Sequence, residues 1–389
     1  MNSMGRFFVI VLLAGVLVMG LSLPGEADHF HPPARSSILA AIDHLLNQDP
    51  DAAEGECRRL EGLDTSGLLA SFCASYVLLT RAEEKDDPTE DLERFRKEIG
   101  DIIEKLEKAL EKAPKDADLL FLTGMAWGYK ALADGVLKNY FSAYKGLKNS
   151  YNFFQETLKV DPHYYDAYHG LGLYHYSISL LPSFSRAIAS LILPSGNQEQ
   201  GLKELELVAE KGVYLKMMAR FALLRIYAAQ EGGDYEKALG YARELLDRYP
   251  GNPDVYFYLA FIASELGQSE EAFATARRIE QNIQEERNHF SKVMLPRYLQ
   301  LMGKLSMDQG DYQEALTYFT KAIDSGNKRY AWAVAWAWTR MGMIYDLQGN
   351  REEAKRHYRR ALQVDSESLA KDYAKRYLDE PYRGQERKG

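Results

Sequence analysis

The sequence predicts an all-α protein in which antiparallel helix pairs stack into an array. Two observations lead to this prediction: a short Gly-to-small string recurs along the second half, and Pro-led acidic strings precede several of the helical patterns. Composition agrees, because 46% hydrophobic residues in a chain of 389 supply a large core and exclude wholesale disorder. A net charge of −8 argues against nucleic-acid binding, since the chain lacks the basic excess of such proteins.

The first residues have the order of a secretory signal peptide. Met1–Arg6 is short with one positive charge, Phe7–Leu23 is almost wholly apolar, and Ala27 ends a stretch that suits a cleavage site. We therefore expect residues 1–27 to be removed and the mature chain to be exported to the periplasm. The apolar run is just shorter than an ordinary spanning helix, so an uncleaved anchor in the inner membrane is the alternative.

Residues 28–113 are predicted to be an N-terminal helical region that repeats only loosely. Cys57 and Cys73 lie in two helical patterns on either side of the turn-like Gly62–Thr65, as paired positions on a helix hairpin would. In an exported protein these positions favour a disulfide, and two buried free thiols are the alternative. Thr89–Lys112 is predicted to be one long charged amphipathic helix.

Residues 114–366 carry the recurring strings. Each string places a Gly five residues before a small residue, with acids between, at intervals of roughly 34 to 43 residues. The Gly suits the left-handed end of a first helix, and the Asp or Asn that often follows suits the start of a second helix. The strings begin at Gly196, Gly233, Gly267, Gly310 and Gly349.

This pattern resembles the tetratricopeptide-repeat family, whose helix pairs have signature positions on both helices. The last repeat matches best, through Trp338, Met341, Gly342, Tyr345, Ala354, Tyr358 and Ala361. The resemblance covers roughly 115–365 and implies a right-handed superhelix whose concave groove is lined by first helices. It also implies a scaffold that binds a protein or peptide, and we expect such a scaffold to serve in a cell-envelope assembly.

The family positions that face the groove fall mainly on aromatic side chains and cations in this sequence. The resemblance therefore predicts partner contacts at Phe121, Tyr129, His169, Tyr176, Phe221, Arg225, Phe257, Phe261, Arg297 and Lys304. Phe and Tyr suit peptide side chains, and the cations suit acidic groups or a C-terminus. For each of these residues, packing against the next repeat is the alternative.

Two further segments depart from the repeat pattern. Residues 180–195 are predicted to be an insertion between the two helices of one repeat, and 180–194 is apolar with Pro near both ends. It is either a short helix packed on the array or an exposed element that docks a partner or a membrane. Residues 367–389 are predicted to be a C-terminal helix and a charged tail, which leaves two alternatives: an open groove, or a groove filled by this tail.

Catalytic and metal-binding patterns were not found in the sequence. It contains no HExxH, GxSxG or Walker-type string. His163, His169 and His175 follow one another at six-residue spacing, which puts neighbours on different sides of a helix and argues against a shared metal. We therefore predict a protein that is not an enzyme, with no cofactor and no metal. Membrane contact through the N-terminus or 180–194 is the alternative to a purely protein-binding role.

Overall fold

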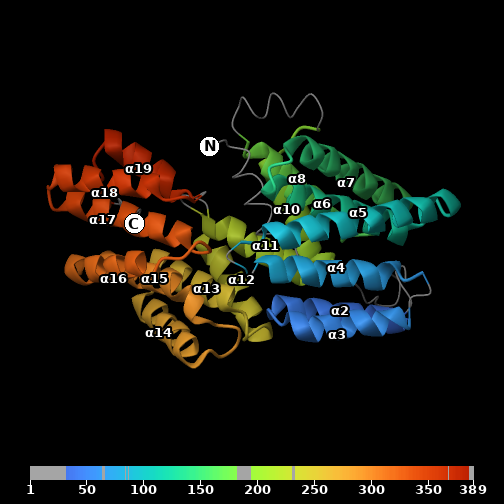
Figure 1. Cartoon of the computed structure of the whole chain (residues 1–389), viewed down its shortest axis with the longest axis horizontal. Coiled ribbons are helices and arrows are strands. Elements are labelled where there is room, and N and C mark those ends of the chain that lie inside the picture. The colour runs from blue at the N-terminus through green and yellow to red at the C-terminus, as the bar shows by residue number, and fades with distance from the viewer. Residues whose placement is uncertain are drawn as a thin grey trace. The chain divides into compact units, whose positions relative to one another are not determined.

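The computed structural model describes residues 32–63, 66–83, 85, 87–181, 194–229, 233–366 and 368–384. Within these ranges every regular element is a helix, which confirms the all-α fold class of antiparallel helix pairs (Figure 1). The chain divides into two compact units. Unit 1 contains residues 1–233 and 247–249, and unit 2 contains residues 234–246 and 250–389. No helix within the described ranges is long and apolar enough to cross a membrane.

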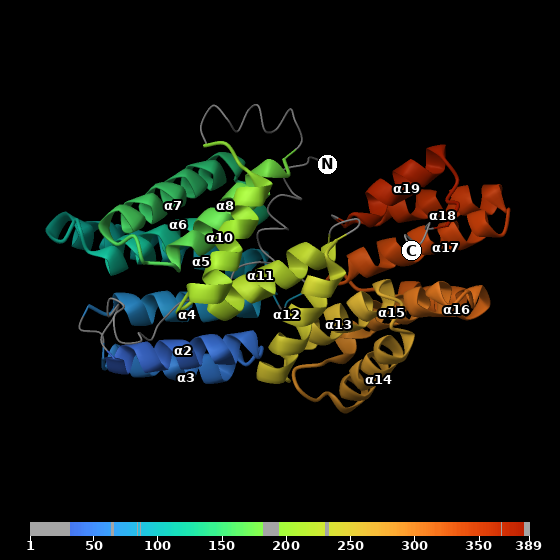
Figure 2. The same cartoon turned by 180° about the vertical axis from the view of Figure 1, so that it is seen from behind.

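Unit 1 is a series of antiparallel helices in which each helix packs on the next (Figure 2). Its helices are α2 (Pro32–Leu46), α3 (Pro50–Glu61), α4 (Leu68–Glu83), α5 (Thr89–Lys112), α6 (Ala117–Val136), α7 (Tyr140–Val160), α8 (Ala167–Ser179), α10 (Gln198–Lys211) and α11 (Lys216–Ala229). First helices also contact each other, since α2 packs on α4 and α6 packs on α8. The long charged helix predicted for Thr89–Lys112 is confirmed as α5.

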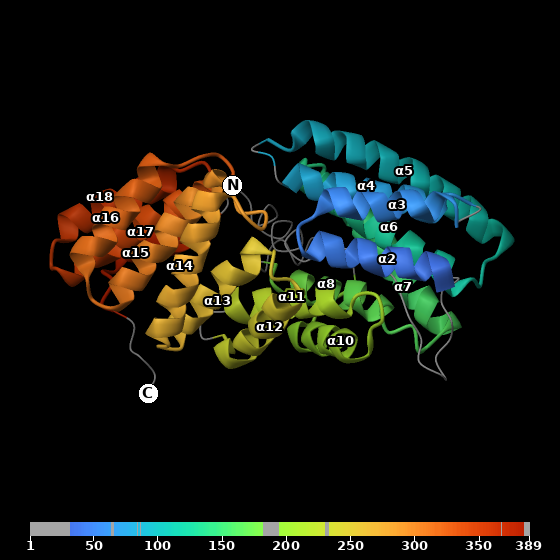
Figure 3. The same cartoon turned by 90° about the horizontal axis from the view of Figure 1, so that it is seen from below.

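Unit 2 repeats one packing pattern (Figure 3). Its helices are α12 (Tyr235–Arg248, of which the last residues belong to unit 1), α13 (Pro253–Glu265), α14 (Ser269–Glu285), the 3₁₀ turn η1 (Lys292–Met294), α15 (Leu295–Asp308), α16 (Tyr312–Asp324), α17 (Ala331–Leu347), α18 (Arg351–Gln363) and α19 (Ala370–Asp379). In each pair the first helix packs on the second: α13 on α14, α15 on α16, and α17 on α18. The first helices also pack on one another, α13 on α15 and α15 on α17, and α17 in turn packs on α19.

The turns inside the helix pairs of unit 2 share one geometry. Gly267, Gly310 and Gly349 have φ values of 73°, 82° and 75°, the left-handed conformation that glycine adopts without strain. The residue after each glycine donates its backbone N–H to a carbonyl in the last turn of the first helix; Asp311, for example, donates to Ser306 at 3.0 Å. The prediction of left-handed glycines is confirmed at these positions.

Unit 1 makes the same turn without glycine. Gln48 and Lys138 occupy the left-handed position with φ values of 60° and 63°. The next residue again closes the turn, since Asn139 N donates to the carbonyl of Asp134 at 2.7 Å. The prediction was wrong for Gly196, which has no positive φ: a Cβ there would lie 2.5 Å from the Ser179 nitrogen, so close backbone approach explains this glycine.

Glycines inside the helices let paired helices approach closely. A Cβ on Gly303 would lie 2.4 Å from the Phe319 ring, and one on Gly342 would lie 2.4 Å from the Tyr358 ring. Both rings are fully buried, so each second helix inserts an aromatic side chain over the glycine of its first helix. This arrangement fixes which side of each first helix faces its partner and leaves the opposite side for other contacts.

A disulfide joins α3 to α4. Cys57 and Cys73 are bonded, with their Cα atoms 5.5 Å apart, and both are buried. A short loop closed by a disulfide restricts the unfolded chain, so this bond stabilises the start of unit 1.

Unit 1 also contains a contact between residues far apart in the chain. The Tyr249 hydroxyl donates to Asp43 Oδ1 at 2.6 Å, and Arg248 Nη2 lies 2.9 Å from Asp43 Oδ2. Tyr249 is buried, and burial raises the pKa of its hydroxyl, an effect to which the Asp43 hydrogen bond adds. The boundary between the two compact units falls near residues 234–250, inside the array predicted for 114–366. Near the predicted boundary at 113, helix α5 packs directly on α6.

Two of the predicted segments lie outside the described residues. These are the signal peptide 1–27 and, apart from the residues at its ends, the insertion 180–195. Of the predicted C-terminal region, α19 and residues 380–384 are described.

Candidate functional site

Most of the predicted contact residues of unit 1 are buried. Phe121 is fully buried, with its ring centroid 4.7 Å from that of Tyr164 and 5.9 Å from that of Phe154. The structure likewise buries Tyr129, His169 and Tyr176, whereas Phe221 and Arg225 on α11 are half-buried. In unit 1 the buried residues of the predicted set therefore pack against neighbouring helices, and they expose almost no surface to a partner.

His169 is a buried residue of this set whose pKa is shifted by its surroundings. It is 2% exposed, and burial lowers its pKa from 6.5 to about 4. Its Nε2 atom is buried without a hydrogen-bond partner among the described residues. The imidazole is therefore neutral at physiological pH, and its titration will affect stability.

In unit 2 the predicted residues come together on one surface, which we call the first-helix face of unit 2. It consists of Asp254, Phe257, Phe261, Glu265, Arg297, Lys304, Asp308, Trp332, Trp336 and Arg340, from α13, α15 and α17. Arg297 forms an ion pair with Asp254 and lies 3.9 Å above the centre of the Phe257 ring. This predicted cation is therefore already paired, in a contact that links α15 to α13.

Lys304 is paired in the same way. Its Nζ lies 2.8 Å from Glu265 Oε1 and 2.5 Å from Asp308 Oδ2, and 5.1 Å from the centre of the Phe261 ring. Lys304 and Phe257 are buried, whereas Phe261 and Arg297 are half-buried. Arg297 and Lys304, two of the three predicted cations, therefore join neighbouring repeats of the chain to each other.

Arg340 is the cation that the sequence analysis missed. It stacks 4.6 Å from the centre of the Trp336 ring and has neither an ion-pair partner nor a hydrogen-bond partner for its side chain within the described part of the chain. Burial lowers the pKa of its guanidinium, and the negative charges of Asp308 and Glu265 offset this only in part. The signal was present, because Trp332, Trp336 and Arg340 are four residues apart and so share one side of a helix.

The C-terminal segment lies against the last turn of α17. The backbone N–H of Tyr382 donates to Asp346 Oδ2 at 2.9 Å, while Arg351 and the Tyr358 hydroxyl bind the same carboxylate. The Tyr382 side chain joins the cluster around buried Met343. The chain's own C-terminal segment therefore covers the surface around Asp346 and Met343 on α17.

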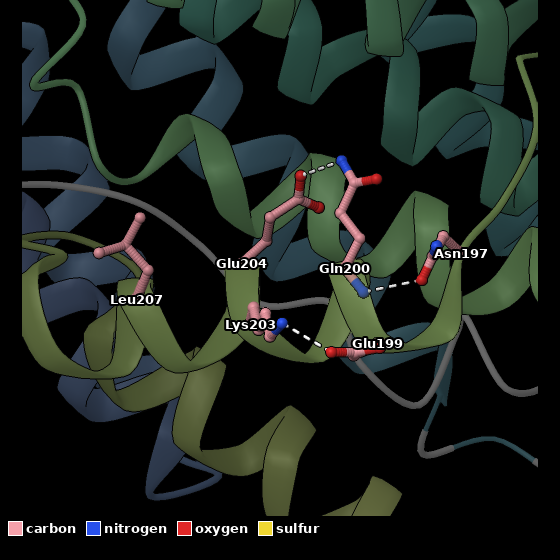
Figure 4. A pocket seen from close by; sticks show the side chains of 6 residues that line it. All are labelled: Asn197, Glu199, Gln200, Lys203, Glu204 and Leu207. Atoms are coloured by element: carbon pink, nitrogen blue, oxygen red, sulfur yellow. Dashed lines mark hydrogen bonds and ion pairs between the residues drawn. The ribbon is translucent and has the colours of Figure 1, made fainter.

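A separate hollow of about 400 Å³ lies beside α10 (Figure 4). It is lined by Asn197, Glu199, Gln200, Lys203, Glu204 and Leu207. These polar side chains bind one another: Lys203 Nζ lies 2.6 Å from Glu199 and Gln200 Nε2 donates to Glu204 at 2.9 Å, as Figure 4 shows. Glu204 also lies 2.6 Å from His175 Nδ1. The hollow contains none of the predicted contact residues.

The titratable side chains give no metal centre in the described part of the chain. No group of three or more His, Cys, Asp or Glu side chains there is arranged to hold a metal ion. The three histidines at six-residue spacing lie in different surroundings. His163 is exposed, His169 is buried, and His175 binds Glu204.

Comparison with protein families gives two matches, both to the tetratricopeptide repeat. They cover residues 229–291 and 296–367, the range in which the left-handed glycines and the glycine–aromatic pairs recur. The chain contains tetratricopeptide repeats. The matched ranges include α12 through α18, so the face described above is formed by α13, α15 and α17, the first helices of matched repeats. No curated protein sequence matches this tetratricopeptide-repeat chain.

Solved structures with a similar arrangement of helices include other tetratricopeptide-type proteins. One from Parabacteroides merdae is 14% identical with a TM-score of 0.33, covering 83% of this chain and 99% of its own. The human IFIT1 dimer with m7Gppp-AAAA is 14% identical with a TM-score of 0.45, covering 97% and 84%. NprR in complex with its cognate peptide NprX is 12% identical with a TM-score of 0.42, covering 90% and 84%. These TM-scores are too low to support an argument, so the family assignment depends on the repeats themselves.

Proposed function

We propose that this protein is an exported tetratricopeptide scaffold that binds a protein or peptide along the first-helix face of unit 2, within a cell-envelope assembly. One observation carries the proposal. Arg340 is a half-buried cation stacked on half-buried Trp336, and no carboxylate among the described residues lies within ion-pair distance of it. A carboxylate from a bound chain would supply the missing charge, and such pairs form strong hydrogen bonds when they are shielded from water.

The surroundings of Arg340 suit an extended peptide. Trp332, Trp336 and Phe261 are half-buried and offer ring faces to apolar side chains. Lys304 offsets one of the two negative charges of Glu265 and Asp308, so this pair of carboxylates repels an incoming anion less than two free acids would. The face therefore favours a peptide that carries a carboxylate next to an apolar side chain. The net charge of −8 favours a protein ligand over a nucleic acid.

The test is photo-crosslinking of the tagged protein in its native envelope, followed by identification of the captured chain. A Phe261→Ala/Arg340→Gln variant removes one ring and one cation from the face. A Tyr318→Ala/Arg359→Gln variant removes one ring and one cation from second helices and is the matched control. We expect the first variant to lose the captured partner and the control to retain it. Equal capture by both variants would place the binding surface elsewhere.

Affinity for a peptide from the captured partner then tests the chemistry. Loss of one buried carboxylate–guanidinium pair should weaken binding by about 1.5–3 kcal/mol, or roughly 10- to 150-fold. Replacing the acidic residue of the peptide by its amide should cost wild-type binding as much as Arg340→Gln does, and should cost that variant nothing further. An additive effect of the two changes would show that the peptide carboxylate does not bind Arg340.

Export is proposed on two grounds. The N-terminal segment has the order of a signal peptide, and the Cys57–Cys73 disulfide suits an oxidising compartment. The N-terminal residue of the protein isolated from the periplasmic fraction tests this proposal, and Asp28 is expected. A protein in the membrane fraction that still begins at Met1 would favour the alternative of an uncleaved N-terminal anchor. A cytosolic protein with free thiols would overturn the proposal of export.

A further inference from the structure

The exposed side of α7 carries lysines and an aromatic ring. Phe141, Lys145 and Lys148 are exposed and follow α7 at spacings that put them on one side, and the exposed Lys138 lies in the turn just before the helix. The other side of α7 is buried against α6 and α8 through Ala143, Tyr144, Leu147 and Phe154. We call the exposed residues Lys138, Phe141, Lys145 and Lys148 the basic face of α7.

None of the three lysines of this face, Lys138, Lys145 and Lys148, forms an ion pair with another described residue. The helix contains a single acid, Glu156, which pairs with Lys159 at 2.6 Å beyond the face. On the packed neighbour α6, the buried Asp134 binds Lys130 and Ser142 at 2.6 Å and so faces inward. The face is therefore a positively charged strip on a chain whose net charge is −8.

Phe141 gives this strip an apolar point. Its side chain is 79% exposed, the highest fraction among the exposed large hydrophobic residues. Phe141 lies between Lys138 and Lys145, on the second helix of a pair, so it is separate from the first-helix face of unit 2. Single exposed hydrophobic residues are common, but an aromatic ring among unpaired lysines has the composition of an interfacial helix.

We propose that the basic face of α7 docks on a bilayer surface that contains anionic lipids. The lysine ammonium groups would lie at the lipid phosphates while their methylene stems and the Phe141 ring enter the interface. Charge complementarity commits the proposal to a bilayer, because an array of phosphates can satisfy all the lysines at once. The exposed side of one helix presents a ridge, which suits a deformable lipid surface. An acidic protein segment is the competing occupant, and the experiment distinguishes the two.

The experiment measures co-sedimentation with vesicles of phosphatidylglycerol and phosphatidylcholine, and with vesicles of phosphatidylcholine alone. Four proteins are compared: wild type, Phe141→Ala, Lys145→Glu/Lys148→Glu, and the control Lys97→Glu/Lys105→Glu. The control lysines are exposed on α5, also form no ion pair within the described residues, and lie among the acids of that helix. Both double variants change the net charge equally. Each protein is tested from residue 28 and at full length, so that Phe7–Leu23 contributes equally to every comparison.

We expect the wild-type protein to bind the anionic vesicles and to lose this binding at higher salt concentration. It should not bind vesicles of phosphatidylcholine alone. Reversal of Lys145 and Lys148 should weaken partitioning by about thirtyfold or more. Phe141→Ala should weaken it by about tenfold and leave its salt dependence unchanged. The α5 control should bind as wild type does. Equal loss in both double variants would reduce the effect to net charge and overturn the proposal, as would binding to polyglutamate without binding to vesicles.

Discussion

The first helices of unit 1 and unit 2 use equivalent positions in opposite ways. In unit 1, Phe121 and His169 lie inside the packing of neighbouring helices. In unit 2, Arg297 and Lys304 form ion pairs that run from one first helix to the next, with aromatic rings half-exposed beside them. The same helix pairing thus accompanies an apolar core in unit 1 and a polar, partly exposed face in unit 2. The repeat pattern fixes the side of each first helix that packs on its second helix, whereas the residues on the other side of the first helix can vary.

The largest expected effect is the loss of a buried ring from unit 1. Phe121→Ala should lower the free energy of unfolding by about 3–5 kcal/mol, since it leaves a cavity between Phe154 and Tyr164. Phe261→Ala, at a half-buried position of unit 2, should cost less than half as much. Urea denaturation followed by circular dichroism measures both. Equal costs would remove the contrast between a core and a face.

Removal of the disulfide should act on unit 1 alone. Cys57→Ala/Cys73→Ala opens a loop with a sequence separation of 16, which should cost about 3 kcal/mol. Hydrogen exchange should become faster in α2–α4 and stay unchanged in α15–α18. A reducing agent should reproduce the change in wild type and add nothing in the variant. Faster exchange in unit 2 would show that the two regions unfold together.

Acid should destabilise the protein through His169. Its pKa is about 4 in the fold and 6.5 when unperturbed, so below pH 6.5 the unfolded chain binds a proton that the fold excludes. The free energy of unfolding should therefore fall between pH 6.5 and pH 4, by roughly 3 kcal/mol at most. His169→Gln should flatten that slope, and His163→Gln, at an exposed position, should not. An unchanged slope in His169→Gln would assign the acid response to other groups.

Removal of the buried cation of unit 2 tests the ion-pair network. Lys304→Met keeps the stem but leaves Glu265 and Asp308 without their partner, which should cost about 2 kcal/mol. Lys321→Met on the second helix α16 removes an exposed lysine and should be close to neutral. Thermal unfolding in parallel measures both. A neutral Lys304→Met would mean that the network contributes little to the stability of unit 2.

The smallest expected effect concerns the C-terminal segment. A chain that ends at Asp379 loses the hydrogen bond from Tyr382 to Asp346, but Arg351 and Tyr358 continue to bind that carboxylate. We expect a loss of about 1 kcal/mol in the free energy of unfolding. A chain that ends at Gly384 is the control and should match the full chain. If the segment also competes for the proposed face, only the shorter chain should capture the partner more strongly.

Local sequence signals predicted the helix pairs well where they depend on backbone conformation. Gly267, Gly310 and Gly349 mark their turns because glycine adopts a positive φ without strain. The same turn at Lys138 gave no such signal, because the protein tolerates a strained residue there while Asn139 closes the turn. The position of this turn was therefore not predicted from the sequence, although its geometry is the same as in unit 2.

The candidate site was predicted as a set of positions, and for each residue both ligand contact and packing within the chain were left open. Arg297 and Lys304 each bind a carboxylate of the chain itself, which the sequence pattern did not predict. Arg340 was overlooked, although Trp336 four residues before it marks the same side of the helix. The family pattern names positions along one helix, whereas the pairing of charges depends on the side chains of the next helix.

The sequence by itself determined the all-α class, the repeat family and the limits of helices such as Thr89–Lys112, because helical periodicity and turn glycines are local properties. The tertiary structure alone decided which first-helix side chains are buried, which cations are paired and where Asp43 meets Tyr249. The physical reason is distance along the chain. Burial and ion pairing join residues that are far apart in sequence, and their energies are settled only when the helices pack.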